Sequence, residues 1–261
     1  MTEKSIFNKY HQSNFENKLS PSFFNKHTLS YKPIAENFRK KKNVKFLTVG
    51  FPKSGNVWLN SMIAECLEID VKPSHNCFVT FTHSNLNTAI LFDQSILRGA
   101  CLIRDCRDVI VSYYHYIESE GFRANASRNF SYRNIKEFYF DFFVNYLDKY
   151  VVNLENLIDG YVEFGWPIIR YESLVDEPNE TLKILFDRWN INVTEKKIIN
   201  AIKNSSLKSM RKGGGKQLIK THKSHFRKGG YGQYKKELPA KVLKDVSVRY
   251  KNYLEKWGYD I

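Results

Sequence analysis

The 261-residue sequence has no long apolar run and few cysteines. No stretch approaches the roughly 18 to 20 apolar residues that a membrane-spanning helix needs, and the N-terminus lacks the apolar segment of a secretory signal. The four cysteines, Cys66, Cys77, Cys101 and Cys106, form no CxxC pair. This spacing argues against structural zinc and against a disulfide framework. The sequence therefore predicts a cytoplasmic protein with reduced thiols and no membrane span.

Acidic residues are also scarce: 27 Asp and Glu stand against 41 Lys and Arg, a formal net charge of +14. Such an excess predicts an anionic partner, which can be a phosphorylated cofactor, a nucleic acid, an acidic polymer or a membrane surface. Hydrophobic residues make up 42% of the chain and aromatic residues 15%. This composition supports a sizeable core and excludes a wholly disordered chain.

Strand and helix patterns alternate along the chain. Short apolar runs typical of buried strands lie at residues 44–49, 100–103 and 167–171. Apolar residues at helical spacing lie at 56–68, 105–118, 133–152, after Pro178, and at 240–257. This alternation predicts an α/β fold with a parallel sheet flanked by helices on both faces. Residues 1–43 show no clear period and are interpreted as an irregular N-terminal arm.

The loop after the first strand has a modified phosphate-binding pattern. Gly50 and Gly55 have the spacing of a Walker A motif, but Asn56-Val57 replace its Lys-Ser/Thr, and Lys53 lies inside the loop. The start of a helix attracts anions through its free N–H groups and its dipole. Because the Ser/Thr that holds Mg²⁺ is missing, the pattern predicts a P-loop-like phosphate site without metal. An ordinary turn with a solvent-facing lysine explains the spacing equally well.

Four segments, in order, resemble the landmarks of PAPS-dependent sulfotransferases. Residues 52–59 (PKSGNVWL) are similar to the PKSGTTWL signature, and residues 102–115 to the second signature, with Arg104 and Ser112 eight residues apart. Residues 170–174 resemble the YEDL-type segment, and residues 226–234 the RKGxxGDW loop. The resemblance implies a P-loop-like sulfotransferase domain over residues 44–261, with PAPS as cofactor.

The resemblance also implies which residues bind that cofactor. The first loop would hold the 5′-phosphate and present Trp58 to the adenine; its residues are Lys53, Ser54, Gly55, Asn56, Val57 and Trp58. Tyr171 would also meet the adenine. The 3′-phosphate would be held by Arg104, Ser112, Arg227, Lys228 and Gly229. An ion pair with Asp108 is the alternative role for Arg104.

Residues 203–236 contain eleven Lys and Arg and no Asp or Glu, which also fits a nucleic-acid-binding surface. A basic nucleic-acid-binding protein is therefore the alternative function. Two separated basic sites fit a nucleotide with 5′- and 3′-phosphates better than a duplex, so nucleic acid is the less favoured partner. A P-loop kinase is a weaker third possibility, because the Lys-Ser/Thr pair is missing.

Sulfuryl transfer needs a group that takes the acceptor's proton. The resemblance assigns this role to His83, which follows Thr82 and precedes Arg104 by 21 residues. His222, in a second Thr-His pair, is the competing candidate. Lys53 would stabilise the leaving phosphate in one in-line step, and the acceptor would be a small molecule or a glycan. The acceptor itself and the oligomeric state are not predicted.

Overall fold

The computed structural model describes residues 46–71, 79–83, 98–119, 132–151, 153–163, 165–216 and 227–261. The expected N-terminal arm, residues 1–43, lies outside the described residues, as do Cys77 and His222. In the part of the chain that is described, no helix is long and apolar enough to cross a membrane.

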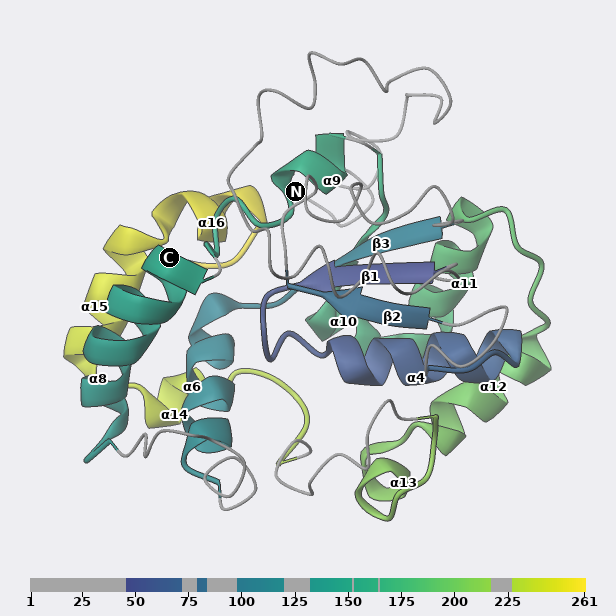
Figure 1. Cartoon of the computed structure of the whole chain (residues 1–261), viewed down its shortest axis with the longest axis horizontal. Coiled ribbons are helices and arrows are strands. Elements are labelled where there is room, and N and C mark those ends of the chain that lie inside the picture. The colour runs from purple at the N-terminus through teal and green to yellow at the C-terminus, as the bar shows by residue number, and fades with distance from the viewer. Residues whose placement is uncertain are drawn as a thin grey trace.

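Four parallel strands form the central sheet (Figure 1): β1 (Phe46–Gly50), β2 (Val79–Thr82), β3 (Arg98–Ile103) and β4 (Ile168–Arg170), in the order β2-β1-β3-β4. The predicted α/β class with a central parallel sheet is confirmed. Strand β2 is absent from the sequence prediction, because a four-residue run is too short to show a period. Tyr171, expected at the end of a strand, instead begins a helix.

The helices cover both faces of the sheet, as predicted. Their bounds are α4 (Asn56–Leu67), α6 (Cys106–Ile117), α8 (Ile135–Glu137), the π-helix η1 (Phe138–Val151), α9 (Asp159–Glu163), α10 (Tyr171–Asp176), α11 (Pro178–Arg188), α12 (Glu195–Asn204), α13 (Leu207–Arg211), α14 (Tyr234–Glu237), α15 (Ala240–Arg249) and α16 (Lys251–Lys256). The helix expected over 240–257 is therefore two helices that meet at Tyr250.

The helix expected over 133–152 differs in its winding. After α8 the chain continues as the π-helix η1, in which hydrogen bonds join residues five apart. The wider turn brings Phe143 and Leu147 into the core, whereas Tyr146, which an α-helical period would bury, is 46% exposed.

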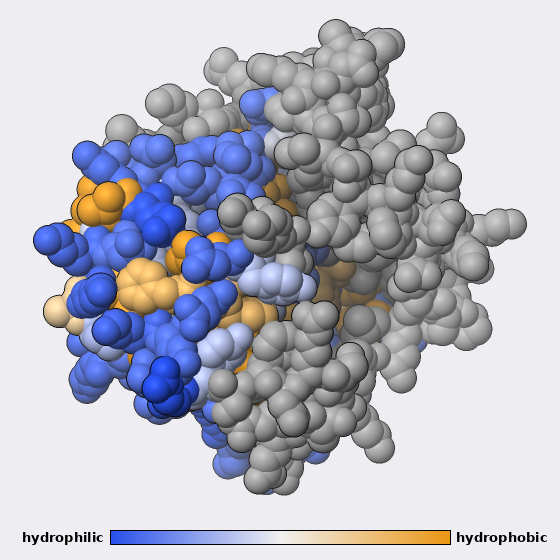
Figure 2. Space-filling model, turned by 60° about the vertical axis from the view of Figure 1, so that its left-hand side comes forward, coloured by the Kyte–Doolittle hydropathy of each residue, from blue (hydrophilic) through white to orange (hydrophobic). Residues whose placement is uncertain are grey.

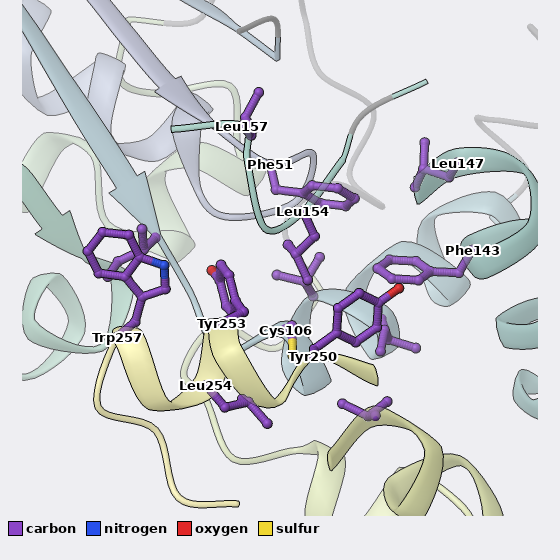
Figure 3. Close-up of a cluster of buried hydrophobic side chains, with 14 of the residues drawn as sticks. Phe51, Cys106, Phe143, Leu147, Leu154, Leu157, Tyr250, Tyr253, Leu254 and Trp257 are labelled. Atoms are coloured by element: carbon purple, nitrogen blue, oxygen red, sulfur yellow. The ribbon is translucent and has the colours of Figure 1, made fainter. Parts of the chain in front are cut away.

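Alternation along the strands divides the core into two clusters. Cys101 and Ile103 of β3 face the helices α6, η1, α15 and α16, and Leu102 faces α4, α11 and α12. Figure 3 shows Phe51, from the loop after β1, in the first cluster with residues of α16 and η1. The Phe51 and Phe143 rings lie 5.6 Å apart. Because burying such a ring stabilises the fold by roughly 1.5–3 kcal/mol, Phe51 anchors the loop that follows β1.

The order of the strands indicates where a ligand is expected to bind. β1 and β3 are neighbours, and the helices that follow them, α4 and α6, belong to the two core clusters on opposite faces of the sheet. In open α/β sheets, ligands bind at such a switch point, outside the carboxyl ends of the strands.

The described surface near α8 and α15 is mainly hydrophilic, with small separate apolar areas (Figure 2).

Candidate active site

The loop between β1 and α4 is tightly wound. The Ser54 N–H donates to the Phe51 carbonyl oxygen at 3.1 Å, and Lys53 and Gly55 have positive φ angles of 72° and 106°. A Cβ atom on Gly55 would lie 2.7 Å from the Tyr171 ring, so only glycine fits there. Gly55 is also the N-cap of α4 and supplies no side-chain cap. The start of α4 therefore keeps backbone N–H groups available for an anion.

Three polar atoms around this loop are buried without a hydrogen-bond partner in the described structure: Asn56 Oδ1, Trp58 Nε1 and Arg104 Nε. A buried polar group without a partner costs about 1–3 kcal/mol. Tyr171 lies among these residues: its ring is 5.9 Å from the Trp58 ring and 4.1 Å from the Arg104 guanidinium carbon. The cluster has the donors, the acceptor and the aromatic faces that a nucleotide needs.

Arg104, directly after β3, joins two loops that are distant in sequence. Its Nη1 donates to the Lys53 carbonyl oxygen at 3.0 Å, and its Nη2 to the Gly230 carbonyl oxygen at 3.2 Å. No ion pair within 4.0 Å joins Arg104 to Asp108 among the described residues. Asp108 instead accepts the Gly232 N–H at 2.5 Å and the Tyr234 N–H at 3.1 Å.

The described part of the RKGxxGDW-like segment, residues 227–234, which we call the closing loop, is also held by charged contacts. Arg227 donates to Gln233 and, at 3.0 Å, to Glu237, and Lys228 donates to Glu237 at 3.2 Å. Gly229, Gly230 and Gly232 all have positive φ angles, which gives the loop its curvature. Ser112 lies on α6, one helical turn before His115, and His115 Nε2 is 2.5 Å from Glu237. The closing loop and the Ser112 helix are therefore connected.

Lys53, in the loop before α4, lies beside an aromatic residue of α6. Its Nζ is 4.2 Å from the centre of the Tyr116 ring, a cation–π contact. Burial and the neighbouring Arg104 lower the pKa of Lys53 to about 7. Its charge is therefore sensitive to its surroundings near neutral pH.

His83 follows β2 and lies beside the end of β1. Its Nδ1 is 2.6 Å from the Gly50 carbonyl oxygen. Because a carbonyl oxygen only accepts, Nδ1 carries the proton, and in the neutral ring Nε2 has a free lone pair. Burial and the charge of Lys53 lower the pKa of His83, although the bond to Gly50 opposes this shift. The neutral, proton-accepting form is thus the stable one at neutral pH.

Comparison with known proteins identifies the family. A model of the sulfotransferase domain matches residues 67–258, most of the chain. The chain belongs to the sulfotransferase family. This match begins after residues 52–59. The comparison of that segment with the first signature of sulfotransferases therefore depends on the geometry of the loop before α4. No curated protein matches the sequence.

Solved structures have the same fold. Mouse sulfotransferase SULT7A1, complexed with PAP, superposes with a TM-score of 0.64 at 16% identity, over 87% of this chain and 89% of that one. Retinol dehydratase with androsterone and PAP gives a TM-score of 0.61 at 14% identity, over 88% and 87% of the two chains. Retinol dehydratase with retinol and PAP gives a TM-score of 0.60 at 13% identity, over 90% of this chain and 89% of that one. At these identities the likeness concerns the fold.

The structure groups the residues predicted from the sulfotransferase signatures in two neighbouring sets. The first set is the loop Lys53–Trp58 with Arg104 and Tyr171. The second is Arg227 and Lys228, which bond Glu237, with Gly229, whose carbonyl oxygen accepts from Gln233. Ser112 is linked to this second set through His115, one helical turn later on α6, which contacts Glu237. Sequence reasoning gave no site role to Asp108 or Glu237. The available signal for Glu237 was its position, as the first acidic residue after the basic stretch 203–236.

Proposed function

We propose that this sulfotransferase moves a sulfuryl group from PAPS to a hydroxyl or amine, in one in-line step without metal. The observation that carries the proposal is Arg104, which bridges the two loops that the family resemblance assigns to the 5′- and 3′-phosphates. Its own Nε and two nearby atoms, Asn56 Oδ1 and Trp58 Nε1, are buried without a hydrogen-bond partner among the described residues, which supports a nucleotide in the same place. The absence of metal is a prediction from Asn56-Val57, which replace the Mg²⁺-binding pair of a Walker A loop.

Each set of residues has a task in this proposal. The N-terminus of α4, with Lys53, Ser54, Gly55, Asn56 and Val57, holds the 5′-phosphate, and Trp58 and Tyr171 hold the adenine. Arg104, Ser112, Arg227, Lys228 and Gly229 hold the 3′-phosphate. Bound PAPS supplies the sulfuryl group, and its leaving group is adenosine 3′,5′-bisphosphate. The domain extends over residues 44–261, because β1 and α4 complete the sheet and the phosphate site.

His83 is the general base in this proposal. Its Nε2 takes the acceptor's proton as the acceptor oxygen or nitrogen attacks sulfur. The bond from Nδ1 to Gly50 fixes the tautomer that can do so. Lys53 donates to the bridging oxygen, whose negative charge grows as its bond to sulfur breaks, so its contact strengthens toward the transition state.

The acceptor is an apolar molecule with one reactive hydroxyl or amine, rather than an acidic glycan. From Lys53, ring contacts lead through Tyr116 and Tyr113 to Phe142. This series of aromatic rings beside Lys53 favours an acceptor with apolar surface over a charged acceptor. The retinol dehydratase structures contain retinol and androsterone, which are the ligands of that protein.

The reaction is placed in the cytoplasm, a prediction that the free thiols of Cys66, Cys101 and Cys106 support.

The nucleic-acid-binding alternative is less favoured by the contacts of the basic stretch. Arg227 and Lys228 pair with Glu237, and Lys216 donates to the Ile69 carbonyl oxygen at 2.7 Å. Arg227 and Lys216 are thus directed inward, whereas a nucleic acid would meet the exposed cations of the stretch, which are Lys203, Lys208, Arg211, Lys212, Lys228, Lys235 and Lys236.

Calorimetry in EDTA tests the proposal with adenosine 3′,5′-bisphosphate, AMP and a DNA duplex. We expect the bisphosphate to bind most tightly. Arg104→Ala should weaken bisphosphate binding by roughly 2–5 kcal/mol, because it removes a buried charge partner. Equal affinity for AMP and the bisphosphate, or tighter binding of the duplex, would contradict the proposal.

A further inference from the structure

Glu237, at the end of α14, collects donors from two parts of the chain. Its Oε1 accepts from Arg227 Nη1 at 3.0 Å and from Lys228 Nζ at 3.2 Å, and its Oε2 is 2.5 Å from His115 Nε2. Its side chain is 21% exposed. Burial raises the pKa of Glu237, but the bonds from His115, Arg227 and Lys228 lower it to about 2 overall. The carboxylate is therefore charged at neutral pH.

Arg227 is oriented on both sides of its guanidinium. Nη1 bonds Glu237, and Nη2 bonds Gln233, whose own Nε2 donates to the Gly229 carbonyl oxygen at 2.9 Å. Guanidinium is a planar fork with five N–H donors. These two bonds use one donor on each Nη, so they fix the plane of the guanidinium and leave further donors for a ligand. A fork held in this way loses less entropy when it binds an anion.

The same contacts tie the closing loop to α6. His115 lies one turn after Ser112 on that helix, and Asp108, earlier on α6, accepts the Gly232 and Tyr234 N–H groups. Glu237 and Asp108 thus hold both ends of the segment 227–234 against the helix that carries Ser112.

We infer that Glu237 is a positioning residue of the 3′-phosphate site: it orients Arg227 and Lys228 toward the phosphate and, through His115, fixes them relative to Ser112. This inference rests on the proposed function, in which those residues bind the 3′-phosphate. The competing role for the same carboxylate is to occupy the phosphate's place and weaken its binding. The two roles predict opposite effects of removing the charge.

The test measures the affinity of wild type, Glu237→Ala and Glu237→Gln for adenosine 3′,5′-bisphosphate and for AMP, which lacks the 3′-phosphate. We expect Glu237→Ala to bind the bisphosphate about tenfold more weakly, as loss of a bond to a charged group implies. Glu237→Gln, which keeps an acceptor oxygen, should lose less. AMP affinity should be unchanged, which also shows that the variants are folded.

Two further variants separate positioning from general effects. Asp245→Asn removes a similar carboxylate, which bonds Arg249 on α15 at 2.9 Å, and should change neither affinity. If Glu237 acts through Arg227, adding Glu237→Ala to Arg227→Gln should weaken bisphosphate binding less than Glu237→Ala does in wild type.

Tighter bisphosphate binding by Glu237→Ala would overturn the inference in favour of the blocking role. Unchanged affinity, or an equal loss for both nucleotides, would overturn it as well. A wild type that binds AMP and the bisphosphate equally would instead contradict the proposed function, and the inference with it. A preference for the bisphosphate over AMP that Glu237→Ala leaves as large as in wild type would contradict the inference alone.

Discussion

His83 shows how one backbone contact can fix the tautomer of a side chain. Sequence resemblance suggested the residue, but the tautomer depends on the Gly50 carbonyl oxygen, 33 residues earlier in the chain. Parallel pairing of β1 with β2 brings the two together. Since β2 was not recognisable from the sequence, this contact was not predictable. The assignment of His83 as base stays a prediction that mutation can test.

His83→Ala should lower kcat by roughly 10²- to 10⁴-fold, the usual contribution of general base catalysis. Its affinity for adenosine 3′,5′-bisphosphate should stay near that of wild type, because the imidazole acts on the acceptor. His222→Ala is the matched control and should keep near-normal turnover with the same acceptor. If the two variants exchange these phenotypes, His222 is the base.

The pH dependence of kcat/KM reports on both His83 and Lys53. Because burial and Lys53 lower the pKa of His83, the acid limb should lie below the ordinary histidine value of about 6.5. Lys53 must be protonated to stabilise the leaving oxygen, and with its pKa near 7 the rate should fall as pH rises above that value. Lys53→Met should remove the alkaline limb and keep the acid limb. An alkaline limb that persists in this variant would exclude Lys53 as its origin.

Among the elements, those with strong local signals were predictable and those set by tertiary contacts were not. Helix α6 matches its prediction, because Asp105 caps it by accepting the Arg107 N–H at 2.9 Å. The break between α15 and α16 at Tyr250 could not be predicted from the apolar pattern. That pattern continues through Tyr250 and Tyr253, which are both buried. The π-helical winding of η1 likewise depends on packing, because the aromatic residues of that segment also fit an α-helical period.

The loop before α4 gives a prediction at this scale. Gly55→Ala places a Cβ 2.7 Å from the Tyr171 ring at a φ of 106°, so the turn or Tyr171 must shift. We expect the free energy of unfolding to fall by about 1–3 kcal/mol. The affinity for AMP and for the bisphosphate should fall together, because both use the 5′-phosphate loop.

Gly213→Ala is the control for this variant. Gly213 also has a positive φ, 83°, but apart from Gly213 and its two chain neighbours, no atom of the described residues lies within 4 Å of the added Cβ. It should therefore show backbone strain alone, with normal nucleotide affinity in calorimetry and a smaller loss of stability in denaturant unfolding. A Gly55→Ala protein that binds AMP like wild type would show that this turn does not form the phosphate site.

At the scale of the whole molecule, the site depends on strand order. The sequence predicted the parallel sheet, and it pointed to the two segments that we propose bind phosphate, because each has a local pattern. It could not predict that Arg104 would bond both loops, since those contacts span 51 and 126 residues. The charge of +14 is consistent with an anionic cofactor. Part of this excess lies in the site itself, where Asp108 and Glu237 organise the basic loop.

The most direct test of the account is transfer of ³⁵S from labelled PAPS, with EDTA present, to a panel of phenols, alcohols, amines and acidic glycans. The account predicts that label moves to an apolar phenol, alcohol or amine, and that His83→Ala loses this transfer while still binding the bisphosphate. If no member of the panel is labelled by a protein that binds the bisphosphate, or if transfer requires added Mg²⁺, the account is contradicted.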